Sequence, residues 1–186
     1  MPGYLWDTWL AFLDQTNLVV TGLTAVFNLY TRSAGVFYFS AGAVLCSISV
    51  KLVKRVIRQP RPPHIPGRKA KVSYGMPSTH SATISYFATY ILLASTYLRV
   101  HPSLGPPSGA VWRILPPLIC LPWAGSIMMS RVWLGHHTWP QVFAGASYGI
   151  AMASICFALW TGGWNDVGEK AEKIVNAWVT GVRIAK

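Results

Sequence analysis

Long uncharged stretches recur along the chain at about the length that crosses a lipid bilayer, which is roughly 20 residues for an α-helix. Four such stretches lack Lys, Arg, Asp and Glu and predict transmembrane helices at residues 34–50, 81–98, 114–130 and 142–160. A weaker stretch at residues 15–31 contains two asparagines, so it either crosses the membrane or lies at its surface. The pattern predicts an all-α integral membrane protein, a bundle of four to five transmembrane helices.

The two ends of the chain carry weaker patterns. The N-terminus lacks the basic region and the small-residue cleavage site of a signal peptide, so we expect the first segment to stay in the mature protein. Residues 165–186 mix charged and apolar positions at roughly helical spacing, which predicts an amphipathic helix on the membrane surface. Because no linker or low-complexity tract divides the chain, residues 1–186 are expected to form one domain.

Composition and charge narrow the function. Of the 186 residues, 52% are hydrophobic and only 11% are charged, which favours a membrane protein over a soluble one. Sixteen Lys and Arg residues against five Asp and Glu give a formal net charge of +11, which indicates an anionic partner such as a lipid headgroup or a phosphorylated substrate. Residues 15–165 contain no Asp or Glu, so this long middle part lacks the carboxylates of a Mg²⁺ site or a glycosidase pair. The three cysteines are scattered through apolar runs, so we expect no metal and no cofactor.

Basic, hydroxyl and histidine side chains gather where the predicted helices end. The clusters are Lys54 with Arg61, then Ser78, Thr79 and His80, and then Arg131 with His137. If neighbouring helices are antiparallel, all three clusters fall on one membrane face. The basic link at residues 51–79 would by itself also suit a polybasic segment resting on anionic headgroups. The convergence of three clusters, with no carboxylate expected to neutralise them, instead predicts a phosphate site.

The residue types in these clusters suit phosphoryl transfer without a metal. Arg61 and Arg131 can each bind two phosphate oxygens, Lys54 supplies a point charge, and Ser78 with Thr79 opens a helix whose N–H groups favour anions. Of the two histidines, one can attack phosphorus while the other protonates the departing oxygen. A neutral imidazole needs no activating base, so we prefer a histidine nucleophile to a hydroxyl. We expect no catalytic role for His136, which directly precedes His137 in the sequence.

Three ordered motifs resemble a known family, the type 2 phosphatidic acid phosphatase superfamily. The matching motifs are Lys54-x6-Arg61-Pro62, Pro77-Ser78-Thr79-His80 with Thr in place of the usual Gly, and Ser130-Arg131-x5-His137. The resemblance covers about residues 43–160. It implies that His137 is the nucleophile that becomes phosphohistidine, that His80 is the general acid, and that the matching Lys, Arg and Ser side chains hold the phosphate.

Gln141 departs from the superfamily pattern, which usually has Asp at this position to orient the nucleophile. A glutamine can still accept a hydrogen bond from Nδ1 of His137 and leave Nε2 free to attack. On this basis, replacement of Gln141 by Asp should preserve or raise activity. The stretches 74–78 and 137–142, with Gln at position 141, resemble the dolichyl diphosphate phosphatase branch. That resemblance implies a multi-pass enzyme of the endoplasmic reticulum membrane whose active site faces the lumen, and which hydrolyses dolichyl diphosphate so that the carrier is reused in N-glycosylation.

Other functions stay open at this stage. The chain could be a broader lipid phosphate phosphatase acting on phosphatidate or other isoprenyl phosphates, or a protein that binds or moves an anionic lipid without hydrolysing it. Nucleic-acid binding is disfavoured, because no interleaved aromatic platform accompanies the cations. The expected partners are an isoprenoid lipid diphosphate and membrane lipids, with no obligatory protein partner. The cations divide nearly evenly between the two faces, so charge alone does not set the orientation.

Overall fold

A computed structural model describes residues 2–63, 73–104 and 110–180, which are helical over most of their length and contain no strand. Seven α-helices are described: α1 (Pro2–Asp14), α2 (Thr16–Thr31), α3 (Ala34–Ile57), α4 (Thr79–Tyr97), α5 (Ala110–Trp133), α6 (Trp139–Leu159) and α7 (Asn165–Thr180). A short 3-10 turn, η1 (Pro102–Leu104), precedes α5, and a π-helical turn, η2 (Trp160–Trp164), joins α6 to α7. The predicted all-α bundle is confirmed.

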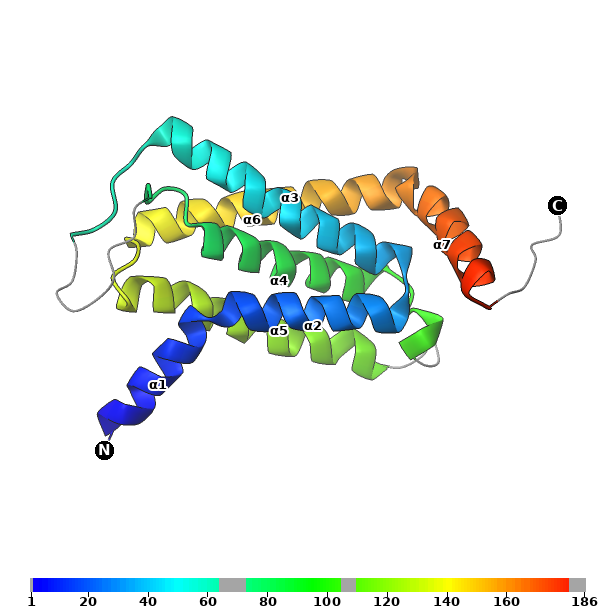
Figure 1. The fold of residues 1–186 in the computed structure, drawn as a ribbon, viewed down its shortest axis with the longest axis horizontal. Coiled ribbons are helices and arrows are strands. Elements are labelled where there is room, and N and C mark those ends of the chain that lie inside the picture. The colour runs from blue at the N-terminus through cyan, green and yellow to red at the C-terminus, as the bar shows by residue number, and fades with distance from the viewer. Residues whose placement is uncertain (1, 64–72, 105–109, 181–186) are drawn as a thin grey trace.

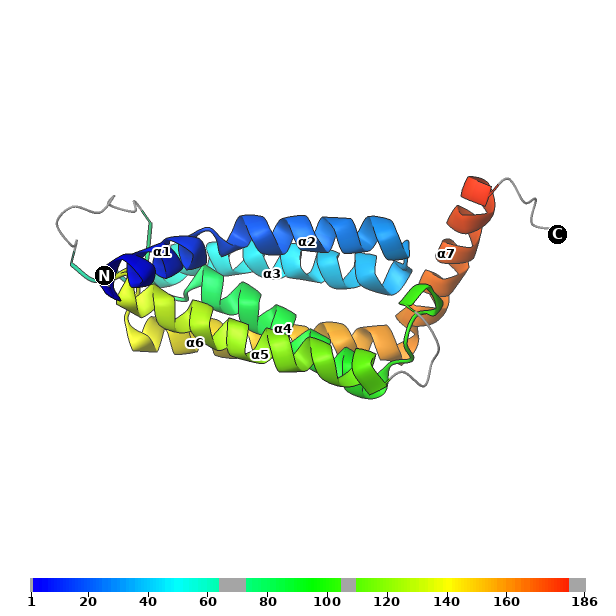
Figure 2. The same ribbon diagram turned by 90° about the horizontal axis from the view of Figure 1, so that it is seen from below.

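Helix α4 lies in the middle of the bundle. It packs between α5 and α6, while α2 and α3 cover the same row from one side (Figures 1 and 2). Close contact between α4 and α6 depends on two small residues, because a Cβ at Gly145 would clash with the carbonyl oxygen of Ser78 and one at Gly149 with that of Ala82. Small residues let membrane helices approach closely, so this pair of glycines fixes α6 against the beginning of α4.

Three helices are long and apolar enough to cross a membrane on their own composition: α3, α5, and α6 with its continuation. A fourth is possible if α1 and α2, which meet at an angle of 53°, form one broken span. The predicted stretch at residues 81–98 does form α4, but this helix is too polar to pass the same test. Its polar groups are accommodated by burial among neighbours: Tyr86 is fully buried, and its hydroxyl donates to the carbonyl oxygen of Phe39 at 3.2 Å.

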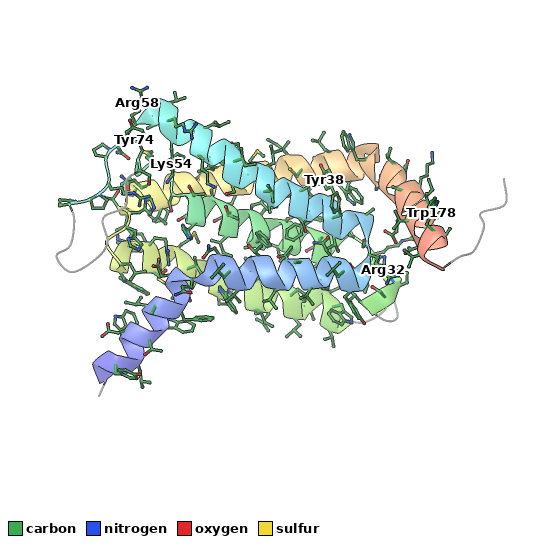
Figure 3. All side chains as sticks on the ribbon, viewed as in Figure 1. Arg32, Tyr38, Lys54, Arg58, Tyr74 and Trp178 are labelled. Atoms are coloured by element: carbon green, nitrogen blue, oxygen red, sulfur yellow. The ribbon has the colours of Figure 1, made fainter. Side chains whose placement is uncertain are left out.

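The outer surface of the bundle carries many exposed large apolar side chains, as expected where helices face lipid. On α3 these include Val44, Leu45 and Ile48, and on α5 they include Ile114 and Leu118. Figure 3 shows side chains projecting from the helices along the whole length of the bundle. The protein is therefore a multi-pass membrane protein.

The ends of the helices alternate as the sequence predicted. Helices α3 and α5 end where α4 and α6 begin, at the left of Figure 1, so all three motif clusters meet at one end of the bundle. Figure 3 shows Lys54 and Tyr74 at this end and Arg32 and Trp178 at the other. At the far end, α7 turns away from the bundle, and Glu172 accepts a hydrogen bond from the backbone N–H of Ala34 at 2.8 Å.

Candidate active site

A pocket of about 310 Å³ opens at the motif-bearing end of the bundle. Six of the residues that the motifs predicted lie in its wall, together with three neighbours: Lys54, Arg61, Thr79, His80, Arg131, His137, and also Lys51, Ser73 and His136. Six of the eight predicted site residues therefore line one pocket. The remaining two, Ser78 and Gln141, lie beside it.

The turn after α5 places His137 in this pocket. Gly135 adopts the left-handed conformation with φ of 69°, which ends the helix at little cost because glycine has no Cβ. The backbone N–H groups of His136 and His137 then both donate to the carbonyl oxygen of Arg131, at 3.0 and 3.1 Å. The loop that holds the predicted nucleophile is thus tied to the last turn of the helix that holds a predicted phosphate ligand.

The side chain of Gln141 determines which nitrogen of His137 carries the proton. Its amide oxygen accepts from the backbone N–H of Thr138 at 3.3 Å, and its amide nitrogen donates to the carbonyl oxygen of Pro60 at 2.9 Å. These partners leave no choice of amide orientation, so the oxygen is the atom 3.2 Å from Nδ1 of His137. Nδ1 must therefore donate, and Nε2 keeps its lone pair.

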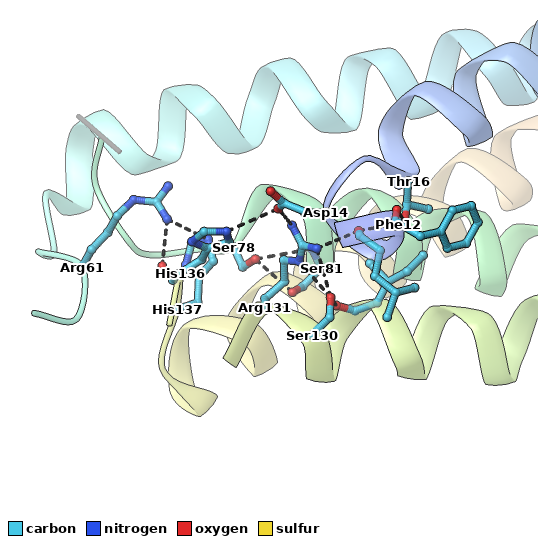
Figure 4. Close-up of polar contacts among 12 residues, drawn as sticks. Phe12, Asp14, Thr16, Arg61, Ser78, Ser81, Ser130, Arg131, His136 and His137 are labelled. Atoms are coloured by element: carbon cyan, nitrogen blue, oxygen red, sulfur yellow. Dashed lines mark hydrogen bonds and ion pairs between the residues drawn. The ribbon is translucent and has the colours of Figure 1, made fainter. Parts of the chain in front are cut away.

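Nε2 of His137 faces the cations of the pocket, with Nη1 of Arg61 3.2 Å away (Figure 4). Only 4% of the His137 surface is exposed. Burial, and then the positive charges of Arg61 and Lys54, lower the pKa of His137 to about 3. The imidazole is consequently neutral at physiological pH, which is the form that can attack phosphorus.

Arg61 is held by the loop that precedes α4. Its Nε donates to the carbonyl oxygen of Ser73 at 2.9 Å, its Nη2 donates to the Ser73 hydroxyl at 2.8 Å, and its Nη1 donates to the carbonyl oxygen of His136 at 2.8 Å. Burial lowers the pKa of Arg61, although the guanidinium stays charged. Lys54, in the last turn of α3, is buried and donates to the carbonyl oxygen of Tyr74 at 3.3 Å.

Arg131 corrects one expectation, namely that no carboxylate would neutralise the cluster. Asp14, at the end of α1, accepts from Nη1 of Arg131 at 2.9 Å and lies 3.3 Å from Nε2 of His136. The sequence argument considered only residues 15–165, and Asp14 stands one position outside that range. Helix α1, which is bent by 53° from α2, packs against α5 and brings the acid in, and the ring of its Trp6 lies 5.1 Å from that of Trp133 in a tilted arrangement.

The second motif is divided between the pocket and the protein interior. Thr79 and His80, in the first turn of α4, line the pocket. Ser78 is fully buried and caps α4, because its hydroxyl oxygen accepts from the N–H of Ser81 at 3.4 Å and from the Ser81 hydroxyl at 2.9 Å. A direct contact between Ser78 and phosphate therefore stays a prediction, and the capping role is what the structure adds.

Several residues that support the site were not predicted from the sequence. Gly75 is the clearest, because a Cβ there would clash with the amide of Gln141, and its own N–H donates to the carbonyl oxygen of Gln59 at 2.7 Å. Gly75 lies within the stretch 74–78, and the close approach of the Gln141 amide explains why a residue without a Cβ stands at this position. Part of the basic link, residues 64–72, lies outside the described residues.

Within residues 2–63, 73–104 and 110–180, no group of three or more His, Cys, Asp or Glu side chains is arranged to hold a metal ion.

Comparison with known proteins identifies the family of this chain and several relatives. The family model of the PAP2 superfamily matches residues 34–164. Dolichyldiphosphatase 1 of Rhinolophus ferrumequinum is 34% identical over 150 residues, which are 80% of this chain and 63% of that protein. Lipid phosphate phosphatase gamma of Arabidopsis thaliana is also 34% identical over 150 residues, covering 80% of this chain and 64% of that one. The chain thus spans less than two thirds of the length of these relatives.

A solved structure supports the fold independently. The crystal structure of a transmembrane PAP2-type phosphatidylglycerolphosphate phosphatase from Bacillus subtilis superposes with a TM-score of 0.65. The match covers 86% of this chain and 77% of that one at 18% identity.

Proposed function

The chain belongs to the PAP2 superfamily, and from that membership and the pocket geometry we propose that it is a metal-independent lipid phosphatase acting through a phosphohistidine. One observation carries the proposal. His137 is buried, donates from Nδ1 to Gln141, and presents the unprotonated Nε2 to a pocket rich in cations. A nucleophile in the right tautomer beside anion-binding groups is what phosphoryl transfer without a metal requires.

In the first step, Nε2 of His137 attacks the terminal phosphorus of the substrate. The new N–P bond forms as the bond from phosphorus to the bridging oxygen breaks, and His80 gives its proton to that oxygen as it leaves. Arg61, Lys54 and Arg131 stabilise the negative charge on the phosphoryl oxygens. Binding of the anion requires Arg61 to turn from Nε2 toward phosphate, which clears the path of the nucleophile.

In the second step, water attacks the phosphohistidine. The neutral His80 now accepts a proton from that water, the N–P bond breaks, and inorganic phosphate and the original His137 result. Gln141 keeps Nδ1 protonated throughout, so the positive charge of the phosphorylated ring is held by a neutral amide rather than a carboxylate. The positive charges of the nearby cations destabilise the positively charged ring, and the negative charge of the attached phosphoryl group offsets this repulsion.

Dolichyl diphosphate is the substrate we propose. The relatives named dolichyldiphosphatase support it, as does Gln141 within a stretch that resembles that branch. The products would be dolichyl phosphate and inorganic phosphate, with the isoprenoid tail lying along the apolar helices. The proposal extends to the endoplasmic reticulum membrane, with the pocket facing the lumen and the released carrier returning to N-glycosylation.

A broader lipid phosphatase is the second candidate, because lipid phosphate phosphatase gamma is also 34% identical to the chain over 150 residues. The test is phosphate release by the purified full chain, in EDTA, from dolichyl diphosphate, phosphatidate and farnesyl diphosphate. The first proposal expects the highest kcat/KM for dolichyl diphosphate. A preference for phosphatidate would support the second candidate. Binding of these lipids without any phosphate release would overturn both and leave an anionic-lipid binding or transport protein.

A further inference from the structure

Arg131 is the most deeply buried cation of the pocket, with 1% of its side chain exposed. A buried guanidinium is costly unless its charge and its N–H groups are matched. Two of its partners belong to α1. Nη1 donates to the carboxylate of Asp14 at 2.9 Å, and Nη2 donates to the carbonyl oxygen of Leu13 at 2.7 Å. The Ser130 hydroxyl accepts from Nε at 3.2 Å and from Nη2 at 3.0 Å.

These contacts stabilise both the end of α1 and the buried Arg131 side chain. The last carbonyl groups of a helix lack partners within the helix, and Arg131 supplies one for α1 at Leu13. Asp14 in turn supplies the opposite charge that offsets the cost of burying the Arg131 guanidinium. The end of α1 and the end of α5 are therefore joined by a hydrogen-bonded ion pair (Figure 4).

Asp14 also reaches the second wall of the pocket. Its carboxylate lies 3.3 Å from Nε2 of His136, whose carbonyl oxygen accepts from Nη1 of Arg61 at 2.8 Å. One carboxylate thus contacts the residue that holds Arg61 as well as Arg131 itself. Through these contacts it can set the spacing of two of the groups that bind phosphate.

Asp14 contacts Arg131 from outside the pocket, so its carboxylate does not compete with phosphate for the same position. Arg131 and His136 are part of the described pocket wall, whereas Asp14 contacts them from the side of α1 and does not contribute to that wall. Nη1 carries a second N–H besides the one given to Asp14. Arg131 can therefore keep its carboxylate partner and still donate to phosphate.

We propose that Asp14 is a positioning residue for phosphate binding, so that α1 completes the active site from outside the region matched by the family model, residues 34–164. The inference rests on the proposed function, since it assigns Asp14 to the same phosphate pocket. It predicts that loss of Asp14 weakens anion binding even where the protein stays folded.

The test measures orthovanadate binding to the purified full chain by calorimetry, alongside kcat and KM. The variants are Asp14→Ala, which removes the partner, and Asp14→Asn, which keeps an oxygen acceptor without the charge. Asp7→Asn is the matched control, because Asp7 lies on the same helix and is exposed. We expect Asp14→Ala to raise the vanadate dissociation constant by about 10- to 100-fold, as when the outer partner of a ligand is removed. We expect a smaller rise for Asp14→Asn and none for Asp7→Asn.

A merely structural role would reduce the amount of folded protein without changing the dissociation constant of what remains. In an Arg131→Lys background, Asp14→Asn should raise the vanadate dissociation constant less than it does in the wild-type chain, because both substitutions act on one contact.

If Asp14→Ala does not fold, the vanadate dissociation constant of Asp14→Asn provides the test. Vanadate binding as tight as wild type, or tighter, in Asp14→Asn overturns the inference, and tighter binding would identify Asp14 as a competing anion. A wild-type chain that binds vanadate but hydrolyses no lipid phosphate contradicts the proposed function while still testing Asp14.

Discussion

Gln141 donates its amide N–H to the carbonyl oxygen of Pro60 at 2.9 Å, across 81 positions of the sequence. The same nitrogen also lies 3.2 Å from Oε1 of Gln59. The oxygen of that amide is the acceptor for Nδ1 of His137, so one side chain joins the nucleophile to the loop that carries Arg61. A carboxylate has no N–H to give, which explains why an amide stands here.

Replacement of Gln141 should therefore lower activity even when an acceptor remains. The sequence alone favoured Gln141→Asp as neutral or activating, but a carboxylate has no N–H and cannot replace the hydrogen bond to the carbonyl oxygen of Pro60. We expect Gln141→Asp to lower kcat/KM by about 10-fold or more, the range for loss of an orienting contact. Gln141→Leu removes both contacts and should cost up to about 10⁴-fold. Steady-state kinetics on the substrate panel measure both, and Gln141→Asp at or above wild-type activity would refute this role of the amide.

The low pKa of His137 predicts an unusual titration. Because burial and the neighbouring cations lower that pKa to about 3, the ring should stay in the neutral Nδ1–H form throughout pH 4 to 8. ¹⁵N NMR of histidine-labelled protein, with His137→Ala for assignment, reports the tautomer directly. Protonation of His137 near its ordinary pKa of about 6.5 would contradict the buried, cation-flanked site.

The lowered pKa of His137 also predicts that the folded protein becomes less stable as the pH falls. The unfolded chain takes up a proton at this residue as pH falls below about 6.5, whereas the folded chain resists until about 3. The contribution of His137 to the free energy of unfolding is therefore complete above pH 6.5 and is lost progressively between these values. His137→Ala should reduce the loss of stability on going from pH 7 to pH 4.

Gly75→Ala should impair activity although Gly75 is not among the residues that line the pocket. A methyl group there would clash with the amide of Gln141 and push it from His137. We expect kcat/KM to fall by about 10- to 100-fold, as for a displaced orienting partner. Gly125→Ala is the matched control, since a Cβ at Gly125 meets nothing within 4 Å. Equal activity of Gly75→Ala and Gly125→Ala would show that the Gln141 contact is not needed.

The fold and the pocket wall followed from the sequence for a physical reason. Uncharged stretches of spanning length predict the main helices of the bundle, and antiparallel neighbours then bring Arg61, His80 and Arg131 to one end without any tertiary detail. Helix α4 shows the limit of this reasoning. It was recognised by its lack of charge, but its hydroxyl groups depend on burial among α3, α5 and α6, which hydropathy does not describe.

The contacts behind the pocket could not be predicted in the same way. The bond from Gln141 to Pro60 and the pair of Asp14 with Arg131 join segments 81 and 117 positions apart. Each depends on a loop or helix end whose direction is set by packing rather than by periodicity. The same holds for Ser78, whose residue type suits both a phosphate donor and a helix cap and whose burial reveals the second role.

The central claim is that His137 becomes covalently phosphorylated. The direct measurement is to quench the full chain during turnover of dolichyl diphosphate labelled with ³²P at the terminal phosphate, and to locate the label by mass spectrometry. The account predicts an acid-labile, base-stable adduct on His137 that is absent from His137→Ala and still forms in His136→Ala. Turnover without such an adduct, or a label on any other residue, would contradict it.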